Sequence, residues 1–194
     1  MHFETDQIYH VYNQGNNRQQ LFYSDENYQY FLRLYRKFIF GKADLLAYCL
    51  MPNHFHLLIN TTSESVKMKQ VGSLQLTELS NGIRMMLTSY SSAINKQLGN
   101  TGSQFRQKTK AKLLDSNNIN YPFVCFNYIH QNPLHSGLVG RMESWEFSSF
   151  RDFAGLRNNS ICNIELAKRI LDFDENNFIE ESYRVINSDL INSL

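Results

Sequence analysis

The sequence predicts an α+β fold in which helices cover an antiparallel sheet. Short segments with alternating or continuously apolar side chains are bounded by turn residues, as is typical of β-strands. Two longer segments repeat apolar residues every three or four positions, as is typical of helices that pack against a core. The chain has 194 residues, of which 42% are hydrophobic and 19% charged, which fits one globular domain with an appendage.

The first four predicted elements are a strand, a helix and the two strands of a hairpin. Ser24, followed by two acidic residues, favours the start of the helix, and Gly41 favours its end. Pro52 and Asn53 are typical turn residues and separate two apolar segments. The predicted segments are a strand over 5–14, a helix over 25–40, and strands over 43–51 and 54–60.

The second half of the chain predicts a polar loop, a long helix, a basic strand and an apolar helix. Pro133 is expected to end this last helix at Asn132, because proline disfavours helix at its own position and at the preceding residue. Shorter helices are expected near the C-terminus. The predicted segments are a loop over 61–74, a helix over about 75–99, a strand over 104–114, and helices over 118–131, about 163–171 and 175–187.

This order of elements predicts a ferredoxin-like sandwich. It contains a strand–helix–strand unit, a hairpin and a second crossover. The two long helices would cover one face of the antiparallel sheet and leave the other face for a ligand or the last helix. We expect residues 1–155 to form the main domain and residues 156–194 to form an acidic, helical C-terminal extension.

Charge is distributed unevenly along the chain. Residues 160–194 carry seven acidic and three basic residues, so residues 1–159 hold a net charge of +5 although the whole chain is only +1. The main domain can therefore present a basic surface to nucleic acid. The three cysteines are widely spaced and predict no disulfide framework and no cysteine zinc site. No signal peptide and no apolar run of membrane-spanning length is apparent, so we expect a cytoplasmic protein without a membrane partner.

His54 and His56 are candidate metal ligands. On the predicted strand they point to the same face, while Phe55 points into the core behind them. Two imidazoles on one rigid strand form half of a metal site. The alternative is that both are ordinary histidines of a buried strand, since histidine is often a satisfied polar residue.

Four basic residues alternate along the predicted strand over 104–114. This spacing places them on one face, and no acidic residue lies between them. They either protect an edge strand against aggregation or form a row of contacts for a phosphate backbone. We favour the second interpretation for these residues, which are Arg106, Lys108, Lys110 and Lys112.

Tyr128 and Asn132 provide the second half of the candidate site. They stand four residues apart on the predicted helix and so share one face. Together with the two histidines, the Asn132 carboxamide oxygen would hold one divalent cation that polarises a phosphodiester. The Tyr128 phenol, activated by the cation or by a nearby lysine (Lys110 or Lys112), would then attack phosphorus and form a covalent intermediate. By itself, a tyrosine beside an asparagine is more often an ordinary surface pair.

Two motifs in this order resemble a known family. The sequence Pro-Asn-His-Phe-His-Leu-Leu, from Pro52 to Leu58, is similar to the His-hydrophobic-His motif of single-tyrosine HUH transposases. The segment from Tyr128 to Val139 is similar to their tyrosine helix, and the asparagine before its proline resembles the REP-associated tyrosine transposases. Flanking blocks, one of which includes Arg18, extend the resemblance over about residues 6–155.

The resemblance implies an enzyme that cleaves and rejoins single-stranded DNA at hairpin-forming repeats, with Mg or Mn as its cofactor. It implies that Tyr128 is the catalytic nucleophile and forms a 5′-phosphotyrosine, and that the metal ligands are His54, His56 and Asn132. Arg18 and the four alternating basic residues are then expected to contact DNA. Two features depart from the family: His135 stands where such proteins often carry arginine, and the acidic extension lies outside the motifs. The cation is expected to bind loosely until a DNA phosphate joins it, since the ligand set has no carboxylate.

Three alternatives stay open at this point. The first is a non-catalytic protein that binds repeat hairpins of DNA or RNA through aromatic and basic residues. The second is a metal-dependent hydrolase with a water nucleophile, in which Tyr128 only shapes the pocket. The third concerns assembly: in a homodimer, Tyr128 of one chain could face the histidines of the other.

Overall fold

The computed structural model describes residues 1–114, 121–171 and 173–186. Its centre is a four-stranded sheet with the strand order β2-β3-β1-β6, and every neighbouring pair is antiparallel. Strand β1 lies between β6 on one side and the hairpin of β2 and β3 on the other, which is the strand order of the predicted ferredoxin-like sandwich. The four strands are β1 (Ile8–Gln14), β2 (Ala43–Met51), β3 (His54–Thr61) and β6 (Lys110–Leu113).

The register of the sheet decides which side chains share a face. Tyr12 of β1 lies opposite His56 of β3 and also opposite Lys110 of β6. Side chains directly opposite one another in an antiparallel pair point to the same face, and their neighbours along the strand point to the other. One face of the sheet therefore carries His10, Tyr12, His54, His56, Lys110 and Lys112.

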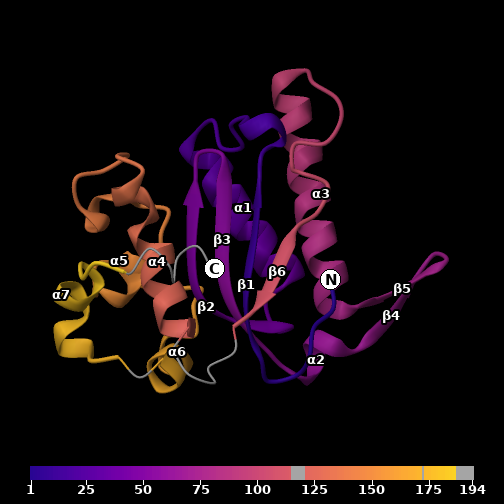
Figure 1. Ribbon diagram of the computed structural model, residues 1–194. Helices are drawn as coiled ribbons and strands as arrows, with labels where there is room; N and C mark the ends of the chain where they lie inside the picture. The colour runs from indigo at the N-terminus through magenta and orange to yellow at the C-terminus, as the bar shows by residue number, and fades with distance from the viewer. Residues whose placement is uncertain (115–120, 172, 187–194) are drawn as a thin grey trace.

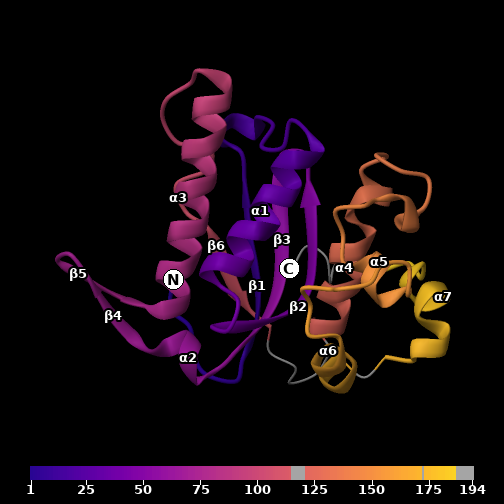
Figure 2. The ribbon, with the colours of Figure 1, turned by 180° about the vertical axis from the view of Figure 1, so that it is seen from behind.

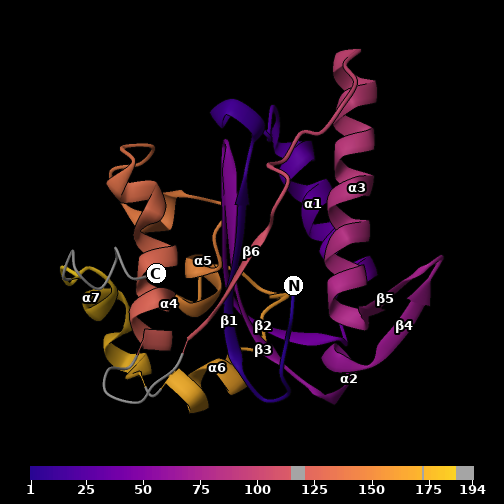
Figure 3. The same ribbon diagram turned by 45° about the vertical axis from the view of Figure 1, so that its right-hand side comes forward.

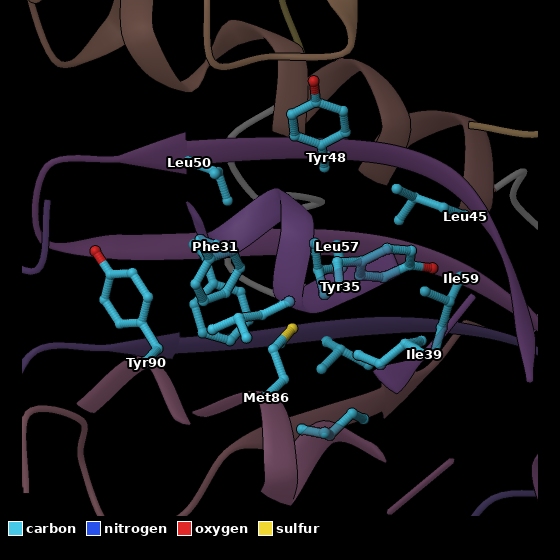
Figure 4. Packing of buried hydrophobic residues seen from close by; sticks show 14 of the residues in the cluster. Phe31, Tyr35, Ile39, Leu45, Tyr48, Leu50, Leu57, Ile59, Met86 and Tyr90 are labelled. Carbon is cyan, nitrogen blue, oxygen red and sulfur yellow. The ribbon is translucent and has the colours of Figure 1, made fainter. Parts of the chain in front are cut away.

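The other face of the sheet is covered by the two long helices, as predicted. These are α1 (Asp25–Phe38) and α3 (Glu78–Leu98), which lie side by side on one side of the sheet (Figure 1; Figure 3). Their apolar stripes pack onto inward-facing strand residues, and Phe31, Leu57 and Met86 lie at the centre of this cluster (Figure 4). Gly82 permits the close contact between the helices, because a Cβ added there would lie 2.4 Å from the carbonyl oxygen of Phe38.

On the face that carries the histidines, α4 (Tyr121–His135) packs mainly over β2 and β3. A second apolar cluster joins this helix to Cys49 and Leu58 of the sheet and to the C-terminal segments behind it. The views from front and back show these segments gathered on the α4 side of the molecule (Figure 1; Figure 2). They are η2 (Met142–Ser144), α5 (Phe150–Phe153), α6 (Ile164–Leu171), η3 (Glu175–Asn177) and α7 (Phe178–Ser182). Because α4 packs mainly over β2 and β3, the part of the sheet formed by β1 and β6 can form a site.

The predicted end of the tyrosine helix at Asn132 is wrong. Helix α4 continues through Pro133 to His135. Pro133 is buried, and packing of the apolar helix between the sheet and the C-terminal segments outweighs its local preference. The side chain of Asn132 also donates a hydrogen bond of 2.7 Å to the carbonyl oxygen of Tyr128 in the preceding turn. Residues 118–120 of the predicted helix lie outside the described residues.

The segment predicted as a loop over 61–74 contains regular structure. A helical turn, α2 (Ser63–Val66), precedes a two-stranded ribbon that projects beyond α3 (Figure 1). The ribbon consists of β4 (Met68–Val71) and β5 (Leu74–Thr77), and Gly72 at its tip has a φ of +60°. Its side chains are mostly exposed, and β4 lacks the alternation of apolar residues that marks a half-buried strand.

The strand predicted over 104–114 is regular only in β6, from Lys110 onward. The Asn13 side chain donates hydrogen bonds to the carbonyl oxygen of Arg106 at 3.1 Å and to Oγ1 of Thr109 at 2.9 Å. Backbone pairing is interrupted here, with a bridge between Gly15 and Phe105 and a bond of 2.9 Å from Arg106 N–H to the Gln14 oxygen, and the Asn13 side chain bonds to the strip where the ladder is missing. The basic residues before β6 therefore stand on an irregular strip at the edge of the sheet.

The C-terminal extension is helical, but its second helix is shorter than predicted. Helix α6 lies within the predicted segment, whereas the segment over 175–187 forms only η3 and α7, and residue 187 lies outside the described residues. In the described part of the chain, no helix is both long and apolar enough to span a bilayer.

Candidate active site

A hollow of about 430 Å³ opens over the uncovered part of the sheet. Its walls come from β1, from the turn between β2 and β3, from the strip before β6 and from α4. This hollow is the candidate site, and it is lined by Tyr12, Asn13, Gln14, Arg18, Asn53, His54, Phe55, His56, Arg106, Lys108, Lys110 and Tyr128.

The hairpin that carries the histidines is firmly held. Strand β3 lies between β1 and β2 and pairs with both along its length. The turn before it accepts three backbone hydrogen bonds. The oxygen of Pro52 accepts from Leu21 at 2.7 Å and from Phe22 at 3.1 Å, and the oxygen of Asn53 accepts from Gly15 at 2.8 Å. The imidazoles therefore project from a rigid element rather than from a loop.

Tyr128 reaches the two histidines within one chain. Its ring centroid lies 5.6 Å from that of His56, with the planes at 81°. The His54 and His56 centroids lie 5.0 Å apart. The histidine strand and the Tyr128 helix, which we predicted to form one site, are thus adjacent in space. No second copy of the chain is needed to bring them together.

The carboxamide of Asn132 lies between His54 and Tyr128. Burial lowers the pKa of His54, and hydrogen bonding to the Asn132 side chain raises it in part. Burial raises the pKa of Tyr128, and hydrogen bonding to the same side chain lowers it in part. The Tyr128 phenol is therefore protonated at neutral pH, and Asn132 favours its deprotonated form.

The carboxamide partner of His54 assigns its tautomer, whereas His56 pairs with a second imidazole. Nδ1 of His54 lies 2.6 Å from Oδ1 of Asn53, a carboxamide oxygen that accepts a hydrogen bond, so the proton stands on Nδ1 and the lone pair on Nε2. Nδ1 of His56 lies 2.8 Å from Nε2 of His10. Among the described residues, no group forms a hydrogen bond with the buried Nε2 of His56. Each histidine thus has its Nδ1 bonded to a neighbour.

His10 is a functional candidate that sequence reasoning missed. It is buried on β1, and its ring lies 5.0 Å from that of His56. The alternation of β1 placed it on the same face as Tyr12. Only the register between β1 and β3 shows that it contacts His56, and one sequence does not contain that register.

The donor set fits one divalent cation. Burial lowers the pKa of His54, and burial together with the neighbouring His10 and His54 lowers that of His56 well below its usual value. Both imidazoles are therefore neutral at pH 7, which metal ligation requires. The described residues include no cluster of three or more histidine, cysteine or carboxylate side chains that could hold a metal. A cation here would rest on the two Nε2 atoms and the Asn132 oxygen, with positions open for a substrate.

Four of the five predicted DNA contacts line the hollow: Arg18, Arg106, Lys108 and Lys110. Lys112 points to the same face of the sheet but does not line the hollow, and its charge acts on Cys125 of α4. Arg18 follows Asn17, and both have left-handed backbones with φ of 59° and 50°. This tight turn brings Arg18 to the rim, where the Asn53 side chain approaches its carbonyl oxygen at 3.5 Å.

Comparison with known proteins finds similar solved structures. No protein-family model matches the sequence, and no curated protein is significantly similar to it. A solved REP-associated tyrosine transposase bound to a REP hairpin aligns over 83% of this chain and 87% of its own, with a TM-score of 0.58 and 16% identity. A bacterial tRNA(His) guanylyltransferase (Thg1)-like protein in complex with ATP aligns over 83% and 74%, with a TM-score of 0.42 and 11% identity. The chain therefore has the fold of a REP-associated tyrosine transposase, the fold that its two motifs predicted.

Proposed function

We propose that this protein is a transposase-type enzyme that cleaves and rejoins single-stranded DNA at hairpin-forming repeats through a covalent bond to Tyr128. The observation that carries the proposal is the approach of the Tyr128 ring to within 5.6 Å of the His56 ring inside one hollow. The fold match supports it, because that relative was solved with a REP hairpin.

Three side chains would hold a divalent cation, Mn or Mg, through Nε2 of His54, Nε2 of His56 and the oxygen of Asn132. When bound, the cation supplies Lewis acidity that stabilises negative charge developing on a phosphodiester. Asn53 holds His54 in the tautomer that presents Nε2, and His10 would do the same for His56 by accepting the proton of its Nδ1.

The Tyr128 oxygen attacks phosphorus of the scissile phosphodiester. A bond forms between that oxygen and phosphorus, and the bond between phosphorus and the 3′ oxygen breaks. The phenol loses its proton in this step, and the 3′ oxygen gains one and leaves as a hydroxyl. Attack of a 3′ hydroxyl on the phosphotyrosine reverses the step and joins DNA without ATP.

Basic side chains on the rim would orient the DNA. Arg106, Lys108 and Lys110 stand on the edge strip, and Arg18 faces them from the turn after β1. No aspartate or glutamate lines the hollow in the described part of the chain, so the rim attracts a phosphate backbone.

A covalent-adduct assay tests the proposal. The protein is incubated with Mn²⁺ and a pool of labelled single-stranded oligonucleotides that carry hairpins with flanks of random sequence. We expect a protein–DNA adduct that resists denaturation, disappears in Tyr128→Phe, and persists in Tyr121→Phe, which removes another phenol from the same helix. Binding of the pool without any adduct would identify a hairpin-binding protein instead. Cleavage that persists in Tyr128→Phe but not in His56→Ala would identify a water nucleophile.

A further inference from the structure

A second and larger hollow lies beside the candidate site. Its volume is about 860 Å³, and it lies between α3 and the chain that leads from the end of α3 into β6. Figure 3 shows this connection descending from α3 along the edge of the sheet. It is lined by Met1, Asn13, Ile83, Arg84, Leu87, Thr88, Ser91, Gly102, Ser103, Phe105, Arg106, Gln107, Lys108, Thr109, Lys110 and Ala111.

The lining combines apolar and basic side chains. Ile83 and Phe105 are buried and form part of an apolar floor together with Leu87. Four cations surround this floor: Arg84, Arg106, Lys108 and Lys110. Within the described residues, none of these four forms an ion pair, and no carboxylate lines the hollow. An apolar floor with unpaired cations around it suits a nucleotide, whose base is flat and apolar and whose phosphate is anionic.

The two hollows share a wall. Arg106, Lys108, Lys110 and Asn13 line both of them. The edge strip that separates the hollows is fastened by the side chain of Asn13, through its bonds to Arg106 and Thr109. A DNA strand with one phosphate at Tyr128 can therefore cross the strip and stay in contact with basic side chains along its path.

We propose that this second hollow binds the single-stranded DNA that continues from the scissile phosphate. The inference rests on the proposed function, since it assumes DNA in the candidate site. The hollow has the size of a pocket for a small ligand, so it takes about one or two nucleotides of a single strand and not a duplex. Bases lie against the floor, and phosphates lie against Arg84 and the strip.

The test measures the binding of a fluorescein-labelled oligothymidylate of about 12 nucleotides by anisotropy at several salt concentrations. All proteins carry Tyr128→Phe, so that no cleavage occurs. Ser91→Glu is compared with Ser92→Glu, because these neighbours on α3 add the same charge but only Ser91 lines the hollow. Arg84→Gln is compared with Arg36→Gln, which removes an exposed charge from α1 away from both hollows.

We expect Ser91→Glu and Arg84→Gln to weaken binding about three- to tenfold, and Arg84→Gln to reduce the salt slope by about 0.7, the value for one phosphate of a single strand. The two control variants are expected to bind like the parent. Equal effects of each variant and its control would overturn the proposal, as would tighter binding of oligouridylate than of oligothymidylate. Formation of an adduct by Tyr128 with no difference between these pairs would refute only the second hollow. Absence of an adduct, together with weaker binding by Ser91→Glu and Arg84→Gln than by their controls, would refute only the proposed chemistry.

Discussion

Replacement of His10 tests whether this buried side chain sets the protonation of the candidate metal ligand His56. Nε2 of His10 lies 2.8 Å from Nδ1 of His56, and both residues are at most 5% exposed. We expect Nδ1 of His56 to donate its proton to His10; in His10→Phe this acceptor is lost, and the proton can move to the nitrogen that metal binding needs. Gln at this position places a carboxamide oxygen close to where the imidazole Nε2 stands, so His10→Gln is the matched control.

The expected magnitude follows from the hydrogen bond that His10→Phe removes. Removal of a hydrogen-bond partner of a metal ligand typically costs 10- to 100-fold in metal affinity, which is about 1.4 to 2.7 kcal/mol. We expect this decrease in Mn²⁺ affinity in His10→Phe and a smaller decrease in His10→Gln. Calorimetric titration of the free protein with Mn²⁺ measures both.

A second readout is independent of the metal. Long-range ¹H–¹⁵N spectra of the imidazoles report which nitrogen carries the proton. We expect the proton of His56 on Nδ1 in the parent and in His10→Gln, and at least partly on Nε2 in His10→Phe. Unchanged Mn²⁺ affinity in His10→Phe, or a parent His56 with its proton on Nε2, would refute the reasoning.

Three further predictions concern assembly, packing and pH. A mixture of Tyr128→Phe and His56→Ala chains is expected to form no DNA adduct, because the phenol and the imidazoles meet within one chain; recovery of adduct on mixing would show a site shared between chains. Gly82→Ala is expected to lower the free energy of unfolding by about 1 to 3 kcal/mol, because its Cβ would stand 2.4 Å from the Phe38 oxygen, whereas Gly140→Ala, with nothing within 4 Å, is nearly neutral; urea titration of both variants checks this. Burial lowers the pKa of His130 to about 3, so between pH 6.5 and pH 3 this residue is protonated in the unfolded chain and neutral in the folded chain. Stability from this residue is present above pH 6.5 and is lost toward pH 3, by about 2 kcal/mol between pH 7 and pH 5; urea titration should show a smaller loss in His130→Gln, and equal losses would contradict the assignment.

The sequence predicts the central sheet well because its signals are local. Strand β2 was predicted with both of its ends, since it is a continuous apolar run that ends at Pro52. The two long helices were found because each has one apolar stripe against the core. The antiparallel order then followed from the sequence of elements alone.

The errors arise where distant contacts override local preference. Pro133 stays inside α4 because the helix is packed on two sides. The strip before β6 is irregular where the side chain of Asn13, more than 90 residues earlier, bonds to it in place of a continuous backbone ladder. The ribbon of β4 and β5 was not predicted because its strands are short and bury little surface.

In the candidate site, too, residues with a local signal were predicted and residues that depend on distant contacts were not. His54, His56, Tyr128 and Asn132 were identified by their spacing on one strand and on one helix, and the fold brings them together. His10 was missed because its role depends on the register of a neighbouring strand. Lys112 keeps the right face of the sheet but lies beyond the hollow, which alternation by itself cannot indicate.

The most direct test locates the covalent bond. The adduct formed with Mn²⁺ and hairpin DNA is digested with protease and nuclease, and mass spectrometry identifies the peptide that retains a nucleotide. The account predicts the modification on Tyr128. A nucleotide on Tyr12, the other phenol that lines the hollow, or on no tyrosine at all, would contradict it.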